Sequence, residues 1–144
     1  MDVSLSNDPY DLDRFVQAQA ADYDRALSEL RAGKKRSHWM WYIFPQIEGL
    51  GQSPTSRRYS IKSAAEARAY LDHPILGPRL RECAALVNGI TDRSAVEIFG
   101  SPDDMKLRSC ATLFASVSDD AVFEQVLEKY FNGQHDQGTL RRLQ

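Results

Sequence analysis

The chain has 144 residues and a formal net charge of −2, with 20 acidic and 18 basic side chains. This length fits a single domain over residues 1–144, and a hydrophobic content of 42% is ordinary for a globular protein. The slight acidic excess argues against nucleic acid as a partner, because nucleic-acid binders usually carry a basic face. The longest apolar run, residues 39–45, is far too short to cross a bilayer, so we expect no membrane association.

Cysteine and histidine usage indicates a reduced protein without a metal. The two cysteines, Cys83 and Cys110, form no CxxC motif, and the acidic start of the chain is unlike a secretory leader. We therefore expect free thiols and a cytoplasmic location. The three histidines, His38, His73 and His135, are dispersed and form no HExxH motif. The sequence accordingly implies no metal site and no cofactor.

Apolar residues in the first half of the chain recur at helical spacing. The pattern predicts helices over 12–19 and 23–30, with Gly33 ending the second. The glycine-rich stretch 49–56 has the composition of a loop. Ser63 and Glu66 have the spacing of a capping box and predict a helix over 63–71.

The second half continues in the same way. An apolar stripe predicts a helix from about 76 to 89, and Ser94 opens a short helix that Gly100 closes. Ser101 is expected to cap the next helix, Asp119 or Asp120 to open the last long one, and residues 136–143 to form a final turn. The sequence thus predicts an all-α, multi-helix domain with about six to eight helices, several of them short, and little or no sheet.

Residues 37–46, which read SHWMWYIFPQ, form the most unusual stretch. Four large aromatic side chains in six residues would expose too much apolar surface outside a core. We therefore expect Trp39 or Trp41 to be mostly buried and the segment to contact at least two other helices. Its polar ends, His38 and Gln46, are then expected at the margin of the core, where their side chains need partners.

This stretch also carries a family resemblance. The chain resembles the DUF1810 family, mostly bacterial proteins that are sometimes labelled calpastatin, at residues 14–19, 37–46, 49–51, 70–80, 99–109 and 112–114. The resemblance implies a mainly helical domain and no established activity, so it supplies no catalytic residue. The calpastatin label does not fit, because an inhibitor of that kind would be a disordered chain and this composition forms a core.

Few residues have the chemistry of a site, and each has a plainer interpretation. His38 is the one catalytic candidate, as an acid–base group beside an aromatic wall, or else it tethers the segment to the backbone. Lys106 and Ser109 lie on one helical stripe with Asp103 and either hold an anion or form a solvated ion pair. The loop that ends near Ser53 resembles a phosphate cradle but lacks the full motif, so a plain turn is the simpler interpretation.

Two functional classes remain open from the sequence. The first is a small-molecule site for a polar or phosphorylated metabolite, with or without catalysis, whose ligand-binding candidates are His38, Trp41, Gln46, Ser53, Lys106 and Ser109. The second is a helical module that binds a protein through exposed aromatic residues. The difference is geometric, because a ligand site requires these polar groups to converge on a concave surface. The sequence assigns no ligand, no reaction and no oligomeric state.

Overall fold

Ten helices make up the part of the chain that this computed structural model describes, residues 8–144. They are α2 (Asp13–Ala20), α3 (Tyr23–Arg31), α4 (Met40–Ile43), α5 (Pro54–Arg58), α6 (Ala64–Asp72), α7 (Leu76–Gly89), α8 (Ala95–Phe99), α9 (Asp103–Val117), α10 (Ala121–Phe131) and α11 (Gln137–Arg142). The prediction of an all-helical fold is confirmed. Within this range the chain forms no sheet, and an isolated parallel bridge joins Ile47 to Ile61.

The helix count exceeds the predicted six to eight. One reason is α5, which lies in the stretch that the glycines marked as a loop. Ser53 accepts a hydrogen bond from the backbone N–H of Ser56 at 3.1 Å, and Pro54 occupies the first helical position. A capping side chain followed by a proline is enough to start a short helix.

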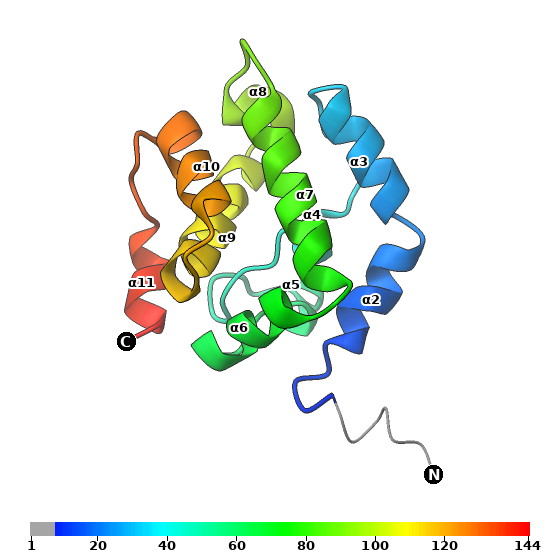
Figure 1. The fold of residues 1–144 in the computed structure, drawn as a ribbon, viewed down its shortest axis with the longest axis vertical. Coiled ribbons are helices and arrows are strands. Elements are labelled where there is room, and N and C mark those ends of the chain that lie inside the picture. The colour runs from blue at the N-terminus through cyan, green and yellow to red at the C-terminus, as the bar shows by residue number, and fades with distance from the viewer. Residues whose placement is uncertain (1–7) are drawn as a thin grey trace.

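The longer helices pack around α7 and α9. Helix α7 contacts α3, α6 and α10, while α9 contacts α6, α8, α10 and α11. Figure 1 shows α7 between α3 on one side and the α9–α10 pair on the other, with α5 below the centre of the view. The short helices α4 and α5 carry the residues of the candidate site described below.

Several helix ends follow from local sequence. Ser94 and Glu97 form a reciprocal capping box at α8, and Gly100 ends that helix with φ +77°. Ser63 caps α6 as predicted, but the Glu66 side chain binds Lys62 and Arg14 and does not complete the box.

The prediction that Ser101 caps α9 is wrong. Pro102, not Ser101, holds the N-cap position and makes no side-chain hydrogen bond. The backbone itself satisfies this first turn, because the N–H groups of Asp104, Met105 and Lys106 donate to the carbonyls of Gly100 and Pro102.

The core is rich in aromatic residues, and the largest fully buried side chains include Trp39, Tyr70, Phe15, Phe44, Phe114 and Phe123. Burial of Trp39 confirms the interpretation of the aromatic segment. Both cysteines are buried and free, as predicted. None of the helices in residues 8–144 is long and apolar enough to cross a membrane. The expectation that the chain does not begin with a secretory leader concerns its first residues, which lie outside the described residues.

Candidate functional site

The Glu29 carboxylate fixes the entry to the aromatic segment. Its Oε1 atom accepts hydrogen bonds from the backbone N–H groups of Arg36 and Ser37 and from the indole Nε1 of Trp39, at 2.7, 2.9 and 2.9 Å, and its Oε2 accepts from Ser37 Oγ at 2.6 Å. Burial raises the pKa of Glu29, but these four donors outweigh it and lower the pKa to about 2. The carboxylate thus holds residues 36–39 in one conformation.

Helix α4 then turns the next aromatic side chains in different directions. Trp39 is fully buried, whereas Trp41 and Tyr42 are half-buried. The Tyr42 hydroxyl donates to Asp22, and the Tyr42 carbonyl accepts from Gln19 Nε2 at 2.8 Å. These contacts hold α4 in place, so that the Trp41 ring stands at the surface between two hollows.

The larger hollow, called the outer cleft below, has a volume of about 430 Å³. It draws residues from the segment before α4, from α4 itself, from the start of α5 and from the start of α9, and is lined by Lys35, His38, Met40, Trp41, Tyr42, Ser53, Thr55, Asp103 and Lys106. The structure therefore brings together four of the six residues that the sequence singled out: His38, Trp41, Ser53 and Lys106.

Two lysines meet on one carboxylate in the outer cleft. Asp103 Oδ2 lies 2.9 Å from Lys35 Nζ, and Asp103 Oδ1 lies 2.8 Å from Lys106 Nζ. Burial raises the pKa of Asp103, yet the hydrogen bonds from Lys106 and Lys35 prevail and hold its pKa below the ordinary value. The group therefore carries two positive charges and one negative charge, which leaves one net positive charge.

Both ammonium groups also lie over aromatic rings. Lys106 Nζ is 4.0 Å from the centre of the Trp41 ring, and Lys35 Nζ is 5.3 Å from that of Trp39. The Lys35 side chain is 8% exposed, and its backbone N–H donates to the Ile98 carbonyl at 2.7 Å. Contacts with ring faces and with Asp103 hold the ammonium groups in place at the wall of the cleft.

Two further residues of the lining provide hydroxyl groups. Ser53 Oγ accepts the capping hydrogen bond of α5, which leaves its own proton able to bind another acceptor. Thr55 is exposed on the first turn of the same helix and also lines the cleft. A ligand in the outer cleft would therefore meet both ammonium and hydroxyl groups.

His38 lies at the rim, with an exposed ring. Its backbone carbonyl lies 3.2 Å from the Tyr42 hydroxyl, whose proton points mainly to Asp22, and within residues 8–144 its ring makes no hydrogen bond. The tether that we considered for His38 is made by Glu29 instead. The imidazole is therefore accessible to a ligand in the outer cleft.

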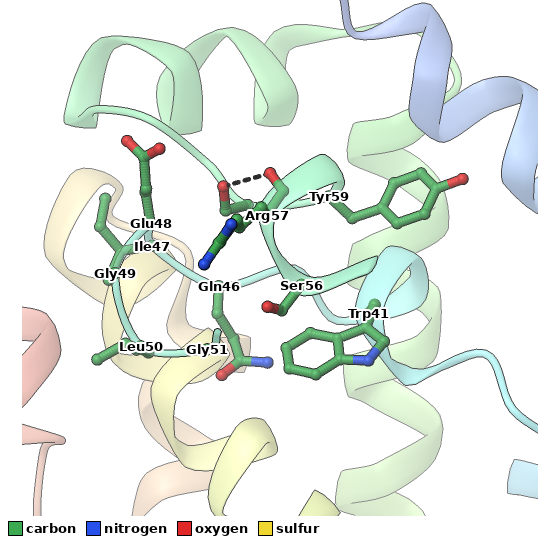
Figure 2. A pocket seen from close by; sticks show the side chains of 11 residues that line it. Trp41, Gln46, Ile47, Glu48, Gly49, Leu50, Gly51, Ser56, Arg57 and Tyr59 are labelled. Carbon is green, nitrogen blue, oxygen red and sulfur yellow. Dashed lines mark hydrogen bonds between the residues drawn. The ribbon is translucent and has the colours of Figure 1, made fainter. Parts of the chain in front are cut away.

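Gln46 lines a second, much smaller hollow, which we call the inner cavity. It measures about 10 Å³ and lies between Trp41, the loop 46–51 and α5. Figure 2 shows the Gln46 amide directed toward the Trp41 indole, with the Ser56 hydroxyl nearby. Trp41 lines both hollows and separates them.

Ser109 is the predicted residue that stands apart. It is 7% exposed, its hydroxyl donates to the Met105 carbonyl at 3.1 Å, and it lines neither hollow. The first turn of α9 also offers less to an anion than its sequence suggested, because three of its N–H groups already have backbone acceptors.

Sequence reasoning missed Lys35, Thr55 and the anchoring role of Glu29. Lys35 lies in a run of three cations directly after Gly33, where positive charge complements the C-terminal dipole of α3. Its low exposure depends on Asp103, which is distant in sequence, so the run itself gave no signal for it. Thr55 was hidden by the interpretation of residues 49–56 as a loop.

Comparison with known proteins supports the fold and gives no activity. A family model described as "Protein of unknown function (DUF1810)" matches residues 9–143. The crystal structure of the conserved hypothetical protein Rv1873 from Mycobacterium tuberculosis is 55% identical and superposes with a TM-score of 0.94, covering 94% of this chain and 98% of that chain. Its source agrees with the expected bacterial character of the family. No curated protein matches the chain.

Proposed function

Because this chain belongs to the DUF1810 family, whose description names no function, we propose one from geometry: the outer cleft binds a small anionic metabolite, such as a phosphorylated one. The observation that carries the proposal is the Lys35–Asp103–Lys106 group at the wall of a concave surface. Its ammonium groups are held in place before any ligand arrives, which lowers the entropic cost of binding.

The composition of the cleft supports this ligand class. A net positive charge attracts an anion, and lysine is a common phosphate ligand in proteins. Tyr42 and Trp41 provide an aromatic wall for the remaining part of a metabolite, while Ser53 and Thr55 provide hydroxyl groups. A volume of about 430 Å³ falls in the usual range for sites that take small molecules. Catalysis is not part of the proposal, and His38 is the residue to test for it.

The competing function, a protein-binding helical module, has less support. Such a module usually presents a contiguous apolar face. The large hydrophobic side chains that are exposed in the described part of the chain are spread over four segments: Tyr10, Ile75, Val96 and Met105. Four of the six candidate residues line one concave surface, which a ligand site requires, although Gln46 and Ser109 do not.

A thermal-shift screen with nucleotides, sugar phosphates and pyrophosphate tests the proposal. A ligand present at 100 times its Kd stabilises the native state by about 2.7 kcal/mol, which raises Tm by roughly 8 °C for a chain of this size. Lys106→Met should reduce the shift, whereas Lys34→Met, an exposed neighbour outside the cleft, should preserve it in full. An equal shift in both variants would place the ligand elsewhere and refute the proposal.

A further inference from the structure

Gln46 carries a buried hydrogen-bond donor without an acceptor. The residue is 7% exposed, and within the described residues its Nε2 atom has no hydrogen-bond partner. Leaving a buried amide unpaired costs about 1–3 kcal/mol, so such a group usually has a ligand or a water. The inner cavity lies at this atom and has the volume of about one water molecule.

The loop over the inner cavity is closely fitted. Gly49 has φ +101°, and a Cβ atom at Gly51 would lie 2.6 Å from Ser56 Cβ and 3.2 Å from Trp41 Cη2. Arg142 Nη2 donates to the Gly49 carbonyl at 2.9 Å and ties the loop to α11. The cavity is therefore a fixed space for one atom, because the loop has no room to collapse onto the Gln46 amide.

The lining of this space includes a cation that has no carboxylate partner among the described residues. Arg57 lines the inner cavity, is exposed, and makes no salt bridge to any described residue. Figure 2 shows its guanidinium group beside the 47–49 backbone, above the Gln46 side chain. The carboxylate in the lining belongs to Glu48, whose side chain is 54% exposed and lies 3.9 Å from Lys62 Nζ. A guanidinium group suits the oxygens of carboxylates and phosphates.

We propose that the inner cavity is a second anion site, which takes one terminal oxygen of a small oxyanion, a carboxylate or a phosphate. Gln46 Nε2 donates to that oxygen, and Arg57 neutralises the charge of the part that stays outside. The size of the cavity sets this division, since one oxygen fits inside and the rest of the anion does not. Lys35 and Lys106 take no part, so this site stands whether or not the outer cleft binds its ligand.

The Gln46 side-chain amide gives a direct readout by NMR, and its resonances are assigned by their loss in Gln46→Met. Titration of the protein with acetate, and separately with inorganic phosphate, should shift these resonances to saturation, and the tighter of the two identifies the class of oxyanion. Chloride at equal ionic strength should leave them in place. Equal shifts with all three salts would overturn the proposal, as would no shift with acetate and phosphate.

Variants separate this site from its neighbour. Arg57→Gln should raise the Kd about tenfold or more, because it removes a charged partner. Arg36→Gln, at an exposed arginine that lines neither hollow, should leave the Kd unchanged. Lys106→Met should also preserve binding. Loss of binding in Lys106→Met but not in Arg57→Gln would assign the anion to the outer cleft and overturn the inner site.

Discussion

Trp39 and Trp41 lie two residues apart, yet their surroundings give them different roles. Trp39 is fully buried, packs against Phe44 and Phe99 at ring separations of 6.2 and 6.5 Å, and donates its indole N–H to Glu29. Trp41 is half-buried, faces the ammonium group of Lys106, and borders both hollows. One indole belongs to the core, and the other forms part of the candidate site.

The comparison teaches that neighbouring aromatic residues in one dense run can have different structural roles. A run of four rings predicts burial, but it does not say which ring stays at the surface. That choice depends on tertiary partners, here a carboxylate for one indole and an ammonium group for the other. The predictions below alter one side of the comparison at a time.

Trp39→Ala should have the largest effect on stability. The substitution removes a fully buried indole and leaves Glu29 without one of its donors. We expect a loss of about 3–5 kcal/mol in the free energy of unfolding. Denaturant unfolding, with the midpoint and the slope both fitted, measures this loss of unfolding free energy. A loss as small as that of Trp41→Ala would remove the distinction between the two indoles.

Glu29→Gln should cost about 1–3 kcal/mol at pH 7, since a charged acceptor of four hydrogen bonds becomes a neutral amide. The loss should depend on pH. The folded-state pKa of Glu29 is lowered from 4.5 to about 2, so its carboxylate stabilises the fold fully above pH 4.5. This contribution falls as the pH drops from 4.5 toward 2. Unfolding curves for the variant and the parent chain should therefore converge in acid, and a constant difference across this range would contradict the role of Glu29.

Trp41→Ala should have the smallest effect on stability, about 1–2 kcal/mol, because the ring is only half-buried. Its effect on binding should be large, since it removes the ring that borders the outer cleft and faces Lys106. Thermal unfolding with and without pyrophosphate measures both quantities in one experiment. A variant that keeps the full ligand-induced shift would show that Trp41 is not part of the site.

Local sequence predicted much of the fold. The start of α8 at Ser94 and its end at Gly100 follow from residues within one turn, and the structure places them there. The start of α9 did not follow, because carbonyl groups replaced the side-chain cap expected from Ser101. Convergence of Ser53 with Lys106 was one of the two alternatives that the sequence left open, and both residues line the outer cleft.

The partners that define the site were harder to predict. Lys35 and Asp103 are far apart in sequence, and either one alone has the pattern of a solvated charge at a helix end. Their 2.9 Å contact arises only when the chain is folded. Gln46 was expected near the same ligand as His38, yet Trp41 stands between them, because α4 turns that ring outward.

The most direct test of the central claim compares the indole N–H resonances of Trp39 and Trp41 during a pyrophosphate titration. Recording it in the Arg57→Gln variant weakens any contribution from the inner cavity. If the outer cleft binds the anion, the Trp41 resonance moves to saturation while that of Trp39, bonded to Glu29, moves much less. Two stationary resonances, or a larger shift at Trp39, would contradict the assignment of the outer cleft as an anion site.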